Sequence, residues 1–77
     1  MVALKLFRYF FGFVRVKATG LYPERIINLC YKNNITVWLI RKKEDALYFN
    51  IAAKDFKALK KIRSKSGISL KIKYKIG

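Results

Sequence analysis

The chain has 77 residues, of which 53% are hydrophobic, so it is too apolar for a disordered basic tail and long enough for one small domain but not for two. Its 18 lysines and arginines face only four aspartates and glutamates, which leaves a formal charge of +14. Most of these cations lack an acidic partner within the chain. We therefore predict one domain over residues 1–77 that contacts an external anion, namely nucleic-acid or lipid phosphate.

The available residue types exclude most catalytic chemistry. The chain has one cysteine and no histidine, so neither a zinc site nor a Cys-His or Ser-His catalytic pair is expected. Cys30 lies within an apolar run, where a small core residue is more common than a nucleophile. The four carboxylates are scattered along the sequence and do not indicate an acid/base pair. We predict that the protein is not an enzyme and has no cofactor, metal site or small-molecule substrate.

The first half of the chain predicts a strand, a helix and a second strand. Residues 11–18 alternate between apolar and other side chains, as in a half-buried strand, and Gly20 ends this pattern. Pro23 suits the first position of a helix that continues to about Lys32, where Asn33-Asn34 closes it. Residues 36–42 are rich in β-branched and aromatic side chains and form the second predicted strand.

The second half predicts a hairpin, another helix and a last strand. The acidic pair Glu44-Asp45 marks the turn into a strand over residues 47–52. Residues 54–65 carry apolar side chains on one side and lysines on the other, which is typical of an amphipathic helix. After Gly67, residues 68–76 alternate strictly between apolar side chains and mostly lysines, which predicts a half-buried strand.

This order of elements predicts an α+β domain of the ferredoxin-like, split βαβ (βαββαβ) type. Right-handed crossovers would place both helices on one face of a four-stranded antiparallel sheet and leave the other face open. The predicted open face carries Phe13, Arg15, Lys17, Tyr48, Asn50, Lys71, Lys73 and Lys75. For Trp38, packing in the core under a helix is favoured over a position among lipid headgroups.

No segment contains about 18 consecutive apolar residues, so no membrane span is predicted. Residues 1–16 are basic and then apolar, as in a signal peptide, but they lack a small-residue cleavage site and Arg15 and Lys17 follow at once. We predict instead a strand or an interfacial anchor, and a packing role in the first strand is as well supported as membrane contact.

Three stretches resemble the start of the YqfD family of bacterial sporulation proteins. They are Gly12-Phe13-Val14-Arg15-Val16-Lys17, Gly20-Leu21-Tyr22-Pro23-Glu24-Arg25 and Asn28-Leu29-Cys30. Trp38 with Ile40 and Arg41-Lys42 is similar to a short strand of that family, and Lys54-Asp55-Phe56 with Leu59 to the opening of its second helix. The resemblance implies a role in spore formation and no catalytic motif. It further implies that the chain is the cytoplasmic N-terminal domain of a longer, membrane-anchored protein, which is located at the cell membrane of sporulating cells.

Two functions from different classes fit these observations. The first is an interaction and assembly module beside the membrane, whose partners are the membrane, other sporulation proteins or further copies of the chain. The residues expected to contact anionic lipid or phosphate are Arg15, Lys17, Lys57, Lys60, Lys61, Arg63, Lys65, Lys71, Lys73 and Lys75. The second is a single-stranded nucleic-acid-binding module like the RRM, which has the same element order, although the third strand lacks the RRM signature. The candidate interfacial or base-stacking aromatics are Phe7, Phe10, Phe11, Phe13 and Tyr48.

Overall fold

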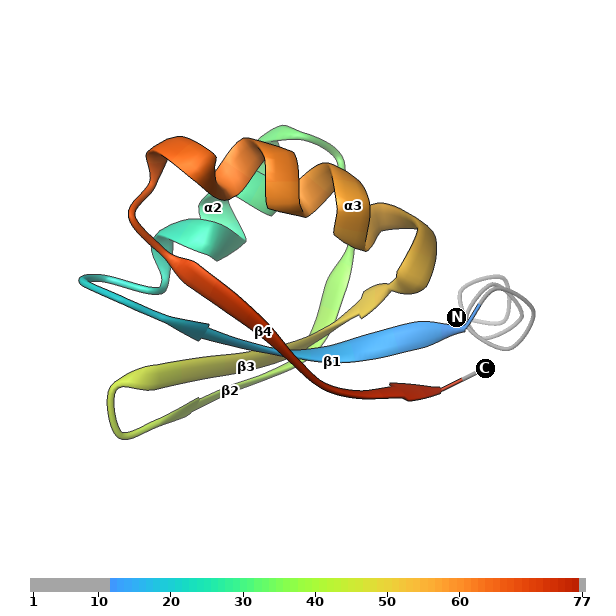
Figure 1. Ribbon diagram of the computed structural model, residues 1–77, viewed down its shortest axis with the longest axis horizontal. Coiled ribbons are helices and arrows are strands. Elements are labelled where there is room, and N and C mark those ends of the chain that lie inside the picture. Colours follow the sequence, from blue (N-terminus) through green and yellow to red (C-terminus); the bar gives the residue numbers. More distant parts are fainter. Residues whose placement is uncertain (1–11, 77) are drawn as a thin grey trace.

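A computed structural model describes residues 12–76 of the chain (Figure 1). Its elements are β1 (Phe13–Thr19), α2 (Arg25–Lys32), β2 (Val37–Lys43), β3 (Ala46–Ala52), α3 (Ala53–Ile62), a 3₁₀ turn η1 (Arg63–Lys65) and β4 (Ser69–Ile76). The predicted order of strands and helices is confirmed. The second predicted helix ends in the 3₁₀ turn, because the α-helical hydrogen bonding stops at Ile62.

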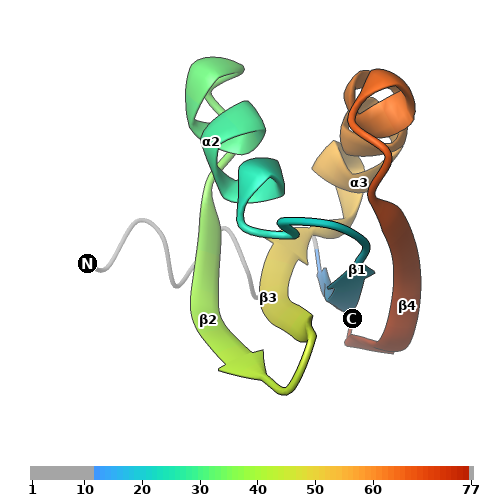
Figure 2. The same cartoon turned by 90° about the vertical axis from the view of Figure 1, so that its left-hand side faces the viewer.

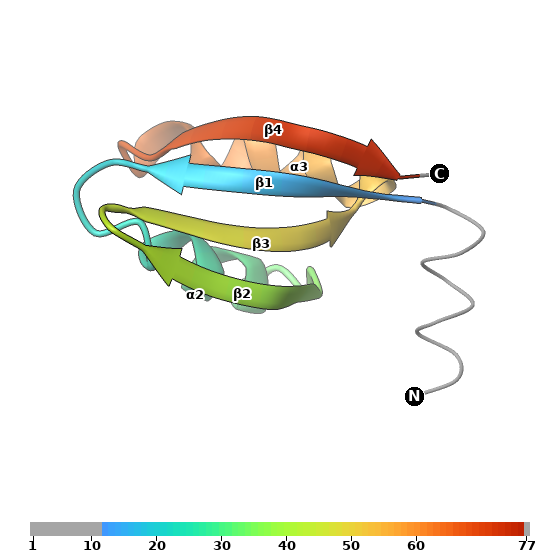
Figure 3. The same ribbon diagram turned by 90° about the horizontal axis from the view of Figure 1, so that it is seen from below.

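The four strands form one sheet in the order β2-β3-β1-β4, and every neighbouring pair is antiparallel. Both helices lie on the same face of this sheet (Figure 2). Neither of the two described helices covers the opposite face, as the view from below shows (Figure 3). The structure therefore confirms the predicted ferredoxin-like α+β fold, and right-handed crossovers explain why the two helices share a face.

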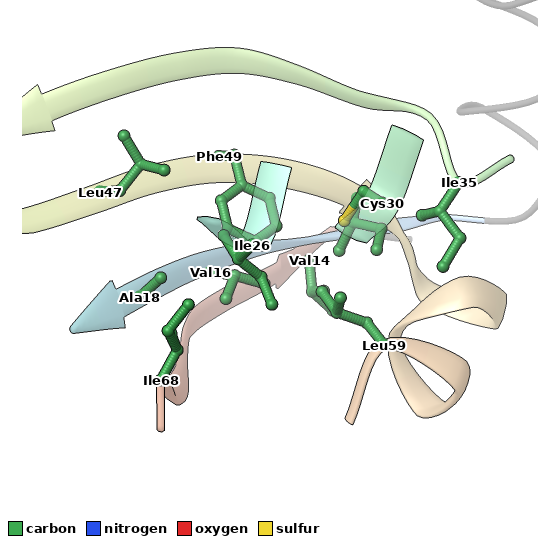
Figure 4. Close-up of a cluster of buried hydrophobic side chains, with 11 residues drawn as sticks. Val14, Val16, Ala18, Ile26, Cys30, Ile35, Leu47, Phe49, Leu59 and Ile68 are labelled. Carbon is green, nitrogen blue, oxygen red and sulfur yellow. The ribbon is translucent and has the colours of Figure 1, made fainter. Parts of the chain in front are cut away.

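The core lies between the sheet and the helices (Figure 4). The alternating residues Val14, Val16 and Ala18 of β1 point into it. From the other side come Ile26 and Cys30 of α2 and Leu59 of α3; Ile35, Leu47, Phe49, Ile51 and Ile68 complete the cluster. Burial of each large aliphatic or aromatic side chain contributes about 1.5–3 kcal/mol relative to exposure.

Cys30 is a buried core residue with a free thiol, as its apolar surroundings predicted. Burial, with a smaller contribution from the negative charge of Asp55, raises the pKa of the Cys30 thiol from 9.0 to about 11. The thiolate is the reactive form of cysteine, so this side chain remains a protonated, unreactive thiol at neutral pH.

Strand β4 contains a bulge that the strict alternation of its sequence does not predict. Arg15 pairs with Tyr74, but the next residue of β1 pairs with Ile72, so Lys73 is an extra residue. Because directly paired residues share a face, Tyr74 and Ile76 lie on the open face, where they are 51% and 50% exposed. Lys75 pairs with buried Val14 and so belongs to the helix side. The prediction that Lys71, Lys73 and Lys75 share the open face is therefore wrong, and Lys71 alone, paired with Lys17, fits it.

Strand β2, at the other edge of the sheet, also contains a bulge. Trp38 pairs with Asn50 and Arg41 pairs with Tyr48, so Leu39 and Ile40 together oppose one residue of β3. Trp38 consequently lies on the open face and not under a helix, which corrects the core position predicted for it. Its ring meets that of Phe13 edge to face, with the ring centroids 5.7 Å apart and the planes at 62°.

Candidate functional site on the open sheet face

The open face gathers aromatic and basic side chains from all four strands. Its aromatic residues are Phe13 on β1, Trp38 on β2, Tyr48 on β3 and Tyr74 on β4; its cations are Arg15, Lys17, Arg41, Lys43 and Lys71. None of the four described strands contains an aspartate or a glutamate. The strands of this face thus contribute cations and aromatic side chains but no negative charge.

Arg15 is the most constrained cation of this face. Its Nη1 donates hydrogen bonds to the backbone oxygen of Leu39, at 2.6 Å, and to Oδ1 of Asn50, at 2.9 Å. Asn50 is only 2% exposed although it points to the uncovered side of the sheet. A buried amide needs hydrogen-bond partners, and Arg15 supplies one from the adjacent strand. The same guanidinium group therefore ties the central strands to the bulge of β2.

Tyr48 lies between two cations at the centre of the face. The guanidinium carbon of Arg15 and the ammonium nitrogen of Lys17 are each 6.0 Å from the centroid of its ring. Such cation–π contacts contribute about 0.5–1 kcal/mol at exposed sites. The contacts therefore place two cations beside the aromatic ring of Tyr48 on this face.

The acidic residues are concentrated at one end of the molecule. Glu24, Glu44 and Asp45 border a shallow hollow between the loop after β1 and the β2–β3 turn. Lys42 closes this hollow with an ion pair to Glu24, at 2.6 Å between Nζ and Oε2. The hydrogen bond in this pair lowers the pKa of Glu24 and raises the pKa of Lys42. The fourth carboxylate, Asp55, lies in the first turn of α3. Glu44 and Asp45 also border a second hollow together with Lys17, Lys43 and Tyr48, so the negative charge beside the open face comes from the β2–β3 turn.

Comparison with known proteins places the chain in a family. Residues 8–77 match the model of the family described as "Putative stage IV sporulation protein YqfD". This chain belongs to the YqfD family. It is 34% identical over 61 residues to "Uncharacterized protein YqfD" of Bacillus subtilis (strain 168), a match that covers 79% of this chain and 15% of that protein. No solved structure matches the chain. The resemblance to the YqfD family seen in the sequence is confirmed.

The basic residues predicted as anion contacts of this YqfD domain fall into two groups on opposite sides of the sheet. Arg15, Lys17 and Lys71 lie on the open face. Three of the predicted lysines lie exposed on α3, in the helix layer, and the ammonium group of Lys60 is 5.9 Å from the centroid of the Phe56 ring. These three are Lys57, Lys60 and Lys61. One flat surface cannot contact both groups at once.

The remaining predicted contacts are distributed differently. Arg63 is only partly exposed, and its Nε is buried with no hydrogen-bond partner among the described residues. Lys73 occupies the bulge of β4 and Lys75 the helix side of the same strand. The side chain of Lys65, and all of Phe7, Phe10 and Phe11, lie outside the described part of the chain.

Sequence reasoning missed Trp38, Arg41, Lys43 and Tyr74 as members of the open face. Their side of the sheet depends on bulges in the two edge strands, which no turn residue marks. Within residues 12–76 no cluster of three or more metal-binding side chains is present. No helix in that range is long and apolar enough to cross a membrane.

Proposed function

We propose that this YqfD domain is a non-catalytic interaction and assembly module at the cytoplasmic face of the cell membrane in sporulating cells. Its open sheet face would bind the anionic phospholipid surface and leave the helix layer free for other sporulation proteins. The observation that carries the proposal is the composition of this face, whose four strands present an aromatic side chain each, five cations in all and no carboxylate. Aromatic and basic residues together are characteristic of membrane interfaces.

The charge on the open face is sufficient for attraction to an anionic bilayer. Each lysine or arginine near such a surface contributes about 1 kcal/mol. Arg15 already donates two hydrogen bonds within the protein, and Lys43 directly precedes the acidic pair Glu44-Asp45. Lys17, Arg41 and Lys71 are therefore the cations best placed to meet lipid phosphate. A flat bilayer can contact only one side of the domain, and the aromatic residues favour the open face over α3.

The test compares two variants of equal charge. One replaces Lys17, Arg41 and Lys71 with glutamine, and the other replaces the helix-layer lysines Lys57, Lys60 and Lys61. Binding is measured by co-sedimentation with neutral vesicles and with vesicles containing 30% anionic lipid, at low and high salt. The unmodified chain should bind only the anionic vesicles, and less so at high salt.

The open-face variant should lose about 100-fold in affinity, since three contacts of about 1 kcal/mol are removed. The helix-layer variant should lose much less. Equal losses would show that bulk charge alone drives binding, and the assignment of the open face would be withdrawn. Absence of binding by the unmodified chain would refute the membrane-proximal role.

A second candidate function, single-stranded nucleic-acid binding, is favoured by one observation. Phe13 and Tyr48 lie on the two central strands, where an RRM stacks bases on aromatic rings. Stacking contributes about 1–3 kcal/mol per base. The same binding assay with a short single-stranded RNA tests this alternative. RNA binding that persists at high salt and disappears in Phe13→Ala/Tyr48→Ala would replace the membrane proposal.

A further inference from the structure

The bulge of β2 exposes two large aliphatic side chains at the edge of the sheet. Leu39 is 66% exposed and Ile40 is 47% exposed. Leu39 also has a positive φ of 52°, a left-handed conformation that disfavours residues with a Cβ atom. Neither feature stabilises the isolated domain, because the side chains remain in water and the backbone is strained. Strain of this kind is commonly retained where it serves a function.

A hydrogen bond contributes to this strained conformation of Leu39. Nη1 of Arg15 donates a 2.6 Å hydrogen bond to the backbone oxygen of Leu39 itself. The same nitrogen is anchored to the buried side chain of Asn50. Arg15 thus links the backbone of the bulge to the centre of the sheet, next to the two exposed apolar side chains.

The residues on either side of the bulge have a characteristic composition. Trp38 precedes it on the open face, and the exposed cations Arg41, Lys42 and Lys43 follow it. Lys42 is paired with Glu24, whereas Arg41 and Lys43 belong to the open face. We call residues 38–43 the β2 wedge. An aromatic ring, two exposed aliphatic side chains and adjacent cations are the combination found in segments that insert into the interface of an anionic bilayer.

We propose that the β2 wedge inserts Leu39 and Ile40 into the boundary between headgroups and acyl chains of an anionic phospholipid bilayer. This inference rests on the proposed membrane-proximal function and names the segment that enters the lipid. Charge complementarity selects this partner. A second copy would bring the same run of cations against itself, and single-stranded nucleic acid offers no apolar phase for two aliphatic side chains.

Trp38 makes the proposal directly measurable, because it is the only tryptophan of the chain. The 77-residue chain is mixed with vesicles containing 30% anionic lipid, with or without bromine atoms on the acyl chains. Bromine quenches tryptophan emission only at short range. The proposal predicts a blue shift of the Trp38 emission on binding and quenching by the brominated lipid.

The matching variant is Leu39→Asn/Ile40→Thr, which leaves the net charge unchanged. Asparagine tolerates a positive φ and threonine suits a strand, so the fold should persist, and the melting temperature checks this. The control is Leu21→Asn/Tyr31→Thr, which removes two other exposed apolar side chains, on the loop after β1 and on α2. The wedge variant should lose about 30-fold in vesicle affinity and show no quenching of Trp38, while the control keeps both.

The outcomes separate the two proposals. Vesicle binding without quenching of Trp38 in the unmodified chain would overturn the wedge and leave the membrane-proximal role intact. No vesicle binding would overturn both. A change of Trp38 emission with protein concentration, or with single-stranded RNA but not with lipid, would assign the wedge to another partner. Quenching in the unmodified chain supports the wedge even if the double variant does not fold.

Discussion

Arg15 should be the most important polar residue for the stability of this domain, and Arg15→Met tests this. Methionine keeps an unbranched side chain but has no donor for Leu39 or for Asn50. The buried amide oxygen of Asn50, in a residue that is 2% exposed, then has no partner, which costs about 1–3 kcal/mol. The bond to Leu39 is solvent-exposed and adds little. We expect a loss of about 2 kcal/mol, or roughly 8–16 °C in melting temperature for a domain of this size.

A double-mutant cycle with Asn50→Leu identifies the cause of that loss. Leucine has nearly the shape of asparagine without its polar atoms, so removing both partners should cost less than removing Arg15 alone. The free energy of unfolding is measured with urea, using Trp38 fluorescence. The double variant should be more stable than the sum of the single effects predicts by about 1 kcal/mol. Effects that add within about 0.3 kcal/mol would refute the proposed role of the Arg15–Asn50 pair.

Two further predictions concern a glycine contact and the buried thiol. Gly20→Ala should destabilise the domain by about 3 kcal/mol and Gly67→Ala by only about 1 kcal/mol, measured by thermal unfolding. Both glycines have positive φ, but only at Gly20 would an added Cβ lie 2.9 Å from a backbone oxygen, that of Gly67; equal losses would contradict this. Because the pKa of the Cys30 thiol is about 11 in the folded protein against an ordinary 9.0, the unfolded chain loses this proton first and stability falls as the pH rises from 9 to 11. Compared with Cys30→Ala over the same range, the unmodified chain should lose about 2 kcal/mol more, and parallel pH profiles would contradict the raised pKa.

The order of elements could be predicted from the sequence because local patterns dominate it. The alternation of β1, the apolar stripe of each helix and the breaks at Gly20 and Gly67 are local signals. The positions of Arg15, Lys17 and Tyr48, which the two central strands present on the open face, were also predicted correctly. These strands pair with each other without a bulge, so one register fixes the face of every residue.

The edge strands could not be predicted in the same way. The alternation of residues 68–76 was the most regular pattern in the sequence, yet Lys73 is accommodated as an extra residue and the pattern reverses face beyond it. A bulge depends on how the partner strand twists and on what covers the edge, and neither appears in the local sequence. The same holds for Trp38, whose position on the open face follows from its pairing with Asn50. The sequence therefore predicted only two of the four aromatic residues of the candidate site, Phe13 and Tyr48.

The two bulges also bear on how copies of the domain can associate. An exposed strand edge can bind another strand through its unpaired backbone groups, and proteins prevent this with bulges and charged side chains. Both edges of this sheet have a bulge and charged side chains. On β2 the bulge is Leu39–Ile40 and the charge is that of Arg41; on β4 the bulge is Lys73, which has a lysine two residues away on either side. Assembly by adding strand to strand would also bring basic edges together. Under the proposed function, contacts with partners would therefore use the open face and the side chains of the β2 wedge, which offer aromatic, aliphatic and basic groups together, and not the unpaired backbone of the strand edges.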